Sequence, residues 1–162
     1  EKENISEVVG VGAIKYADLS QNRQSPIIFE WNKILSFEGN TAPYLQYSYA
    51  RIQSILRKAE EEGKKIDFSK EIIIQDKLEK ALATHIAAFP MAAIKAADTF
   101  KPNIIADYLF ELAKKFNSFY NNCPILNQED EILFSRGLIA KITGETIKDG
   151  LSLLGIETLD RM

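Results

Sequence analysis

The stretch "LSFEGNTAPYLQYSYARIQSILRKA", Leu35–Ala59, carries the clearest helix signals in the chain. Gly39 permits a turn with positive φ, Thr41 is a favourable N-cap, and Pro43 falls in the first helical turn, where its missing N–H costs nothing. These signals predict a helix that begins after Thr41 and continues to about Glu62. Its apolar residues recur at spacings of seven, four and three and form a stripe that is typical of a protein core: Leu45, Ile52, Leu56 and Ala59.

Apolar residues recur at helical spacing in the rest of the chain as well, and short polar segments separate these runs. Pro90 predicts a kink or a break, Asn127 is expected to cap the last helix, and Gly155 is expected to end it. Ser69 is a start signal within a connecting segment, and periodicity does not decide whether Ile27–Leu35 is extended or partly helical. The further helices are expected at about Ile5–Leu19, Gln75–Phe89, Met91–Phe100, Pro102–Tyr120 and Gln128–Leu154.

The pattern predicts the fold class. No segment suggests a ladder of strands, so we expect an all-α fold, a bundle of roughly five to seven helices. The 162 residues suffice for one domain with a substantial core. A content of 46% apolar and 27% charged residues is typical of a globular chain rather than a disordered one.

Composition and charge exclude several classes of protein. No apolar run is long enough to span a bilayer, and the opening "EKENISEVVG" lacks the features of a signal peptide. The single cysteine permits no internal disulfide, which favours a reducing, cytoplasmic setting. The first residue is not Met, which indicates a piece of a longer protein. The net charge of −3 argues against nucleic-acid binding through bulk positive charge, so any such contact must come from a few placed groups.

No group of residues indicates a self-contained active site. His85 and Cys123 are the single histidine and the single cysteine, and they cannot build a zinc site. The glycines of "VGVGAIK" have the wrong spacing for a dinucleotide-binding or Walker A loop. The carboxylates follow solvent-facing positions of the expected helices. We therefore expect no catalytic residue, no metal and no cofactor in this chain.

The helix after Thr41 has a second distinctive face besides its apolar stripe, and this face is aromatic and basic. Tyr44, Tyr47 and Arg51 are spaced three and four apart and share one side, whereas Tyr49 points elsewhere and is assigned to packing. One interpretation places the two tyrosines at the margin of the core with their hydroxyls in water. The other is binding of single-stranded RNA, in which each base stacked on an aromatic ring contributes about 1–3 kcal/mol. The pattern alone leaves both open.

Four segments resemble one known family. "GAIKYADLS", "FEWNKILSFEGNTAPYLQYSYARI", "NNCPIL" and "LLGIETLDRM" are similar to the C-terminal part of arginyl-tRNA synthetases, and the resemblance extends over about Val9–Met162. It implies a class I synthetase anticodon-binding domain, called DALR, over residues 41–162. Residues 1–40 would then be the tail of the catalytic region and an Ω-type loop. The letters D-A-L-R are absent, and "IADYLFELAKKF" occupies their place.

The resemblance implies a function and a set of contacts. The family is expected to bind the anticodon loop of arginine tRNA, and the full-length enzyme charges that tRNA using ATP and Mg²⁺. This chain lacks the HIGH-type and KMSKS-type motifs, so we expect it to be inactive alone. Its partners would be arginine tRNA and its own catalytic domain, and not a membrane. The family positions at the RNA correspond to Asn40, Thr41, Tyr44, Tyr47, Arg51, Tyr120 and Met162.

An alternative function is a helical protein-interaction module. It predicts that an exposed apolar patch, and not the tyrosine–arginine face, is the functional surface. We expect a monomer, although a chain separated from its catalytic domain would expose apolar surface within residues 1–35 and self-associate through it.

Overall fold

The computed structural model describes residues 2–24, 29–64, 66 and 71–162, and the elements within these ranges are all helices. The prediction of an all-α fold is confirmed, whereas the start signal at Ser69 lies outside the described residues. The helices are α1 (Lys2–Leu19), α2 (Trp31–Ile34), α3 (Ala42–Glu61), α4 (Lys77–Ala87), α5 (Phe89–Thr99), α6 (Asn103–Asn122) and α7 (Asp130–Leu153).

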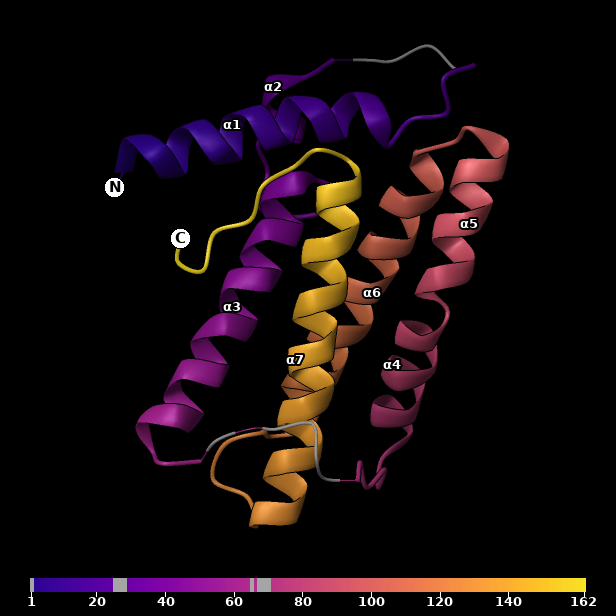
Figure 1. Cartoon of the computed structure of the whole chain (residues 1–162). Helices are drawn as coiled ribbons and strands as arrows, with labels where there is room; N and C mark the ends of the chain where they lie inside the picture. The colour runs from indigo at the N-terminus through magenta and orange to yellow at the C-terminus, as the bar shows by residue number, and fades with distance from the viewer. Residues whose placement is uncertain (1, 25–28, 65, 67–70) are drawn as a thin grey trace.

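The long helices α3, α6 and α7 form the centre of a bundle (Figure 1). Helix α7 contacts both α3 and α6, and the shorter helices α4 and α5 pack against α6. Helix α1 lies across one end of the bundle, where it contacts α3 and α6. The segment after α7 turns back beneath α1 toward α3, so the two ends of the chain lie on the same side of the molecule.

The predicted start of α3 is confirmed in detail. Thr41 is the N-cap, and its hydroxyl oxygen accepts a hydrogen bond from the backbone N–H of Tyr44. Gly39 has a φ of 82°, as the turn requires. Of the expected core stripe, Leu45, Ile52 and Ala59 are fully buried, whereas Leu56 is partly buried and packs against the core.

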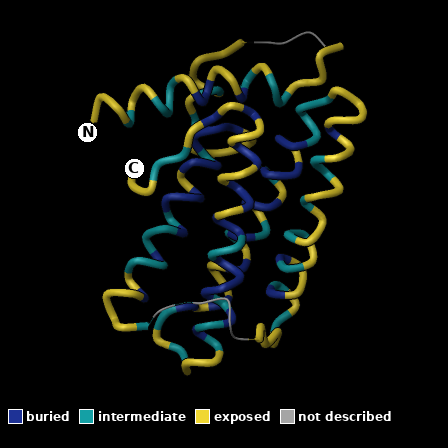
Figure 2. The backbone as a smooth tube through the Cα atoms, in the orientation of Figure 1, coloured by how far each residue is buried: buried dark blue, intermediate teal, exposed yellow. Residues whose placement is uncertain are grey.

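The centre of the core is built by α6 together with α3 and α7. Burial follows the inner faces of these helices and leaves their outer faces exposed (Figure 2). The stripe expected on α6 is confirmed, since all of its members are buried: Ile105, Leu109, Leu112, Phe116 and Phe119.

Two expected helix boundaries are wrong. Asn127 does not cap α7: it has a φ of 60° in the preceding loop, a conformation that asparagine tolerates better than most residues, and Glu129 occupies the cap. Helix α4 begins later than expected, after Asp76, whose side chain forms a capping box with Glu79. Pro90 marks a true break rather than a kink, because α4 and α5 are separate helices.

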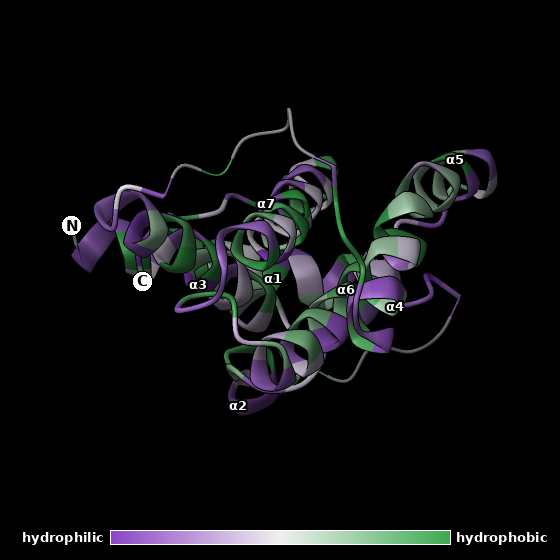
Figure 3. Ribbon diagram, turned by 90° about the horizontal axis from the view of Figure 1, so that it is seen from below, coloured by the Kyte–Doolittle hydropathy of each residue, from purple (hydrophilic) through white to green (hydrophobic). Residues whose placement is uncertain are grey.

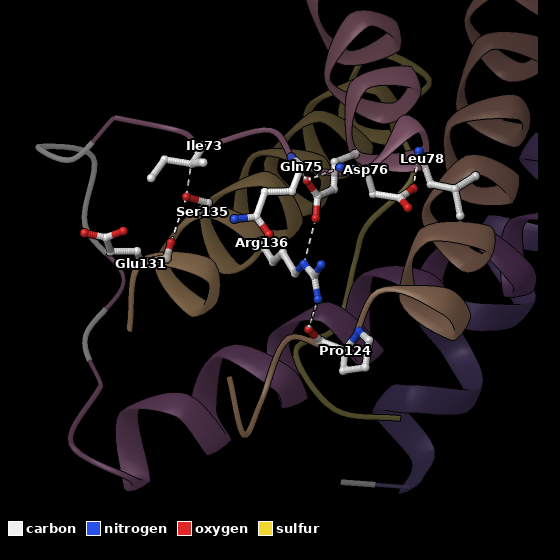
Figure 4. A network of polar contacts seen from close by, with 9 residues as sticks. Ile73, Gln75, Asp76, Leu78, Pro124, Glu131, Ser135 and Arg136 are labelled. Carbon is white, nitrogen blue, oxygen red and sulfur yellow. Dashed lines mark hydrogen bonds and ion pairs between the residues drawn. The ribbon is translucent and has the colours of Figure 1, made fainter. Parts of the chain in front are cut away.

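A buried ion pair joins α4 to α7 (Figure 4). Arg136 Nε lies 2.7 Å from Glu79 Oε1, and Arg136 Nη1 donates to the carbonyl oxygen of Pro124 at 2.7 Å. Glu79 also accepts from the backbone N–H groups of Gln75 and Asp76. Burial alone would raise the pKa of Glu79, but the backbone donors and Arg136 outweigh it and hold this pKa below its usual value. The pair therefore ties α4, α7 and the α6–α7 loop together.

Candidate nucleic-acid interface

Thr41 shapes the turn before α3. Its hydroxyl donates to the carbonyl oxygen of Ser36 at 2.6 Å while it accepts from the Tyr44 N–H at 3.3 Å. Thr41 is nearly buried, so both hydrogen-bonding functions of this hydroxyl serve the local fold. Thr41 therefore stabilises the turn before α3.

Asn40 is exposed, but its side-chain oxygen accepts a hydrogen bond from a residue of the core. The hydroxyl of buried Tyr16 lies 2.6 Å from Asn40 Oδ1 and 3.0 Å from the carbonyl oxygen of Ala106. Burial, with a smaller contribution from Asp107, raises the pKa of Tyr16, so this hydroxyl remains a donor. Asn40 and Thr41 line a hollow of about 420 Å³ beside α1 and α2, and the structure does not bring them into the hollows formed by the other predicted residues.

Arg51 on α3 lies between two exposed tyrosine rings. Its guanidinium carbon is 4.8 Å from the ring centroid of Tyr47 on the same helix and 5.7 Å from that of Tyr120 on α6. Tyr47 is 41% exposed and Tyr120 is 37% exposed, so both rings remain accessible. Such cation–π contacts orient the guanidinium while its outer edge stays available to a ligand.

Tyr44 takes a different position from its helix neighbour Tyr47. Its ring packs edge-on against Phe110 at 5.8 Å, and it is only half exposed to solvent. Asn117 on α6 donates from Nδ2 to the Tyr44 hydroxyl at 2.6 Å and accepts from Arg51 Nη1 at 3.1 Å. Tyr44 and Arg51 are therefore linked through Asn117, and Tyr44 forms the inner layer of the face.

Two hollows flank Arg51, and both have a cationic lining. The first, of about 420 Å³, has Arg51 and Lys58 on one side and the Tyr120 ring on the other. The second, of about 380 Å³, is bordered by Tyr47 and by three arginines: Arg51, Arg57 and Arg161. Among the described residues, no Asp or Glu lines either hollow. A chain with a net charge of −3 thus concentrates positive charge where its aromatic rings are exposed.

Met162 closes this face on the side of α1. It lines the second hollow and also a third, of about 620 Å³, that it shares with Phe37 and Tyr47. The Phe37 and Tyr47 rings meet edge-on at 6.2 Å, and Met162 is 37% exposed. The structure thus brings Met162 and Tyr47 together although they are far apart in the sequence.

Several residues of the face are not predicted by the sequence pattern. Asn117 precedes Tyr120 by three positions, so helical spacing could have found it once Tyr120 was placed there. The same spacing from Arg51 reaches Ser54, which lines both cationic hollows. Arg161 follows α7 in an irregular segment, and no periodicity predicts its position.

Neither a metal centre nor a membrane span is found within the described part of the chain. There, no three or more His, Cys, Asp or Glu side chains are grouped so that they could hold a metal ion. In the same residues, no helix is both long and apolar enough to cross a membrane.

The fold and this face define an all-helical binding domain with an aromatic and cationic surface, a combination suited to unstacked nucleic-acid bases. The chain belongs to the DALR anticodon binding domain family, whose model matches residues 45–162. The match includes Arg51, Tyr120 and Met162, and it covers the segment in which the letters D-A-L-R are absent.

Individual relatives agree with this family. An arginine–tRNA ligase of Fusobacterium nucleatum is 65% identical over 162 residues, which is 100% of this chain and 28% of that protein. One from Vibrio parahaemolyticus is 50% identical over 164 aligned residues, again 100% of this chain and 28% of the relative. The arginyl-tRNA synthetase structure of Thermus thermophilus superposes with a TM-score of 0.91 at 32% identity, covering 100% of this chain and 28% of that one. The chain spans about 28% of the length of these relatives, and the resemblance to arginyl-tRNA synthetases is confirmed.

Proposed function

We propose that this chain is the tRNA anticodon-binding domain of an arginyl-tRNA synthetase, the ATP-dependent ligase that attaches arginine to its tRNA. One observation carries the proposal: Arg51 lies between the exposed rings of Tyr47 and Tyr120, in hollows lined by cations. The family of the domain and the arginine–tRNA ligases among its relatives support the identity of the RNA.

The geometry suggests a division of labour at the RNA. Bases that leave the anticodon stack would lie on the Tyr47 and Tyr120 rings, and Met162 would add an apolar contact beside Tyr47. Arg51 would donate to a phosphate or to a base edge, since its planar guanidinium suits both. Tyr44 would support Arg51 through Asn117. Asn40 and Thr41 would keep the preceding turn in shape for the approaching loop.

The chemistry would belong to the rest of a longer, cytoplasmic protein. ATP and Mg²⁺ would bind in its catalytic domain, and this chain alone would be inactive. Anticodon binding would help to seat the acceptor end of the tRNA in that distant domain through a shift in conformational populations.

We expect the longer protein to act as a monomer. The isolated chain would self-associate through exposed apolar residues of its first 35 positions, such as Val11, Ile14 and Trp31. Size-exclusion chromatography at two concentrations checks this.

The test is direct binding of an RNA hairpin with the anticodon arm of an arginine tRNA. We expect saturable binding that weakens when the anticodon bases are changed. Tyr47→Ala should weaken binding about tenfold, the equivalent of about 1.4 kcal/mol for a lost stacking contact. Met91→Ala, which truncates another exposed apolar side chain on α5, is the control and should leave binding unchanged. Equal affinity of the original chain and Tyr47→Ala would refute the proposal.

A protein-interaction module remains the second candidate because α5 presents an apolar surface. Met91 is 68% exposed, Ile94 54% and Phe100, which follows the helix, 75%. This helix lies at the opposite edge of the bundle from α3 (Figure 3). If α5 is the functional surface, Ile94→Glu should abolish association with a protein partner while Tyr47→Ala leaves it intact, as measured by co-purification with the longer parent protein.

A further inference from the structure

The segment after α7 is fastened to α1 and α3 at several points. Gly155, with a φ of 68°, reverses the chain direction, and Ile156 is buried behind it. Lys15 on α1 donates from Nζ to the carbonyl oxygen of Gly155 at 2.5 Å. These contacts hold the beginning of the segment, six to seven residues before Met162.

Gln46 on α3 forms the next attachment. Its side-chain Nε2 donates to the carbonyl oxygen of Glu157 at 2.8 Å and to that of Val8 on α1 at 3.3 Å. Gln46 is 1% exposed and fills the space beside Gly12, where an added Cβ would lie 2.9 Å from Nε2. The close approach of α1, α3 and the C-terminal segment therefore depends on the absence of a side chain at Gly12.

The final attachment is made by two residues of α3 at Asp160. The Tyr49 hydroxyl donates to Asp160 Oδ1 at 2.9 Å, and Arg57 Nη1 donates to the Asp160 carbonyl oxygen at 3.0 Å. The Tyr49 ring is 4% exposed, so its position is set by the core. Arg161 and Met162 follow Asp160 directly and line the second hollow.

We propose that Tyr49 is a positioning residue for the RNA face, because it holds Asp160 and thereby keeps Met162 beside Tyr47. This inference rests on the proposed function and adds a residue that the family resemblance does not place at the RNA. Residues 157–162 form no helix, and Asp160 itself is exposed. Exposed segments without secondary structure are mobile unless other parts of the chain hold them in place. If the segment detaches for part of the time and only the attached form binds RNA, the apparent affinity for RNA is multiplied by the fraction of molecules in which Met162 is in place.

The test is a double-mutant cycle with the same RNA hairpin. Tyr49→Phe removes only the hydroxyl, and we expect it to weaken binding about three- to tenfold. Met162→Ala should weaken binding by a similar or larger factor. If Tyr49 acts through Met162, Tyr49→Phe should have little further effect in the Met162→Ala background. Independent, multiplicative losses from the two substitutions would overturn the inference.

Tyr108→Phe is the matched control. Tyr108 is also a buried tyrosine, and its hydroxyl donates to the carbonyl oxygen of His85 at 2.6 Å, between α6 and α4. Tyr108→Phe removes a tyrosine hydroxyl, as Tyr49→Phe does, but at a position away from the C-terminal segment. RNA binding should therefore be unchanged. NMR relaxation supplies a second measurement: the backbone order parameters of residues 157–162 should fall in Tyr49→Phe and keep their original values in Tyr108→Phe.

The outcomes separate this inference from the proposed function. Weaker binding in Tyr47→Ala with unchanged binding in Tyr49→Phe would overturn the positioning role and leave the proposed function standing. Unchanged binding in both variants would overturn both. Unchanged binding in Met162→Ala alone would also overturn the positioning role, because Met162 would then contribute nothing that Tyr49 could position.

Discussion

Arg51 and Arg136 both connect one long helix to a neighbouring element, yet their surroundings differ in charge. Arg136 is nearly buried and forms an ion pair with Glu79. Arg51 is half exposed, donates to the neutral amide of Asn117 and lies against two tyrosine rings. No carboxylate of the described residues lines the hollows beside it. The fold depends on an arginine that balances a buried carboxylate, because its removal leaves an unpaired buried charge, whereas an arginine held by neutral groups can pair its charge with a ligand.

The largest effect is expected from Arg136→Met. It leaves Glu79 buried without its cation, and the free energy of unfolding should fall by about 3–5 kcal/mol. Urea denaturation measures the change. The double variant Glu79→Gln/Arg136→Met contains no buried carboxylate and should be more stable than Arg136→Met alone. The reverse order of stability would mean that the ion pair does not explain the role of Arg136.

Arg51→Met should have the opposite effect: it should weaken RNA binding and leave stability nearly unchanged. We expect the free energy of unfolding to change by less than about 1 kcal/mol, because Arg51 is half exposed and pairs with no buried charge. Affinity for the RNA hairpin should fall at least tenfold, since a hydrogen bond from a charged group contributes about 1.5–3 kcal/mol. The dependence of log K on log salt should flatten by about 0.7, the value for one lost phosphate contact on a single strand. A stability loss as large as that of Arg136→Met would erase the distinction between the two arginines.

Asn117→Asp would give Arg51 a carboxylate partner, as Arg136 already has in Glu79. The new carboxylate would pair with the guanidinium and repel phosphate, so RNA binding should weaken about three- to tenfold, with stability unchanged within about 1 kcal/mol. Asn122→Asp is the control, because it adds the same charge on the same helix at a residue that lines neither cationic hollow. If the two aspartates weaken binding equally, net charge and not the pairing of Arg51 is responsible.

The smallest expected effect is on the way stability changes with pH. The pKa of Glu79 is lower in the folded chain than its usual value. Its contribution to stability is therefore fully present above the unfolded value of about 4.3 and is lost as pH falls through the lower folded value. Urea midpoints between pH 6 and pH 3 should decline less steeply in Glu79→Gln than in the original chain. Arg51→Met should retain the original slope, and an identical slope in all three chains would contradict a lowered pKa of Glu79.

Local signals explain what the sequence could predict of the fold. The stripes of α3 and α6 and the cap at Thr41 depend on residues within one or two turns, which periodicity and capping preferences describe well. The Glu79–Arg136 pair joins residues 57 positions apart, so no local pattern contains it. Asn127 and Glu129 compete for the same short region, and the tertiary position of the loop decides which of them caps α7.

The candidate site divides in the same way. Helical spacing alone put Tyr44, Tyr47 and Arg51 on one face, and the contacts through Asn117 and the Tyr47 ring agree with that geometry. Spacing did not show that Tyr44 would turn toward Phe110, because this depends on the packing of α3 against α6. Tyr120 and Met162 entered through the family resemblance, and their contacts with RNA stay a prediction.

The contact between Lys15 and Gly155 also constrains when the surface can form. It spans 140 residues, and a ribosome adds residues at about 5–20 per second, so roughly 7 to 28 seconds separate the synthesis of its two partners. Helix α3 and its tyrosines emerge early, but the second hollow requires Arg161 and Met162. A nascent chain therefore displays an incomplete aromatic and cationic face, which is completed only after residues 155–162 have been synthesised and have packed against α1 and α3.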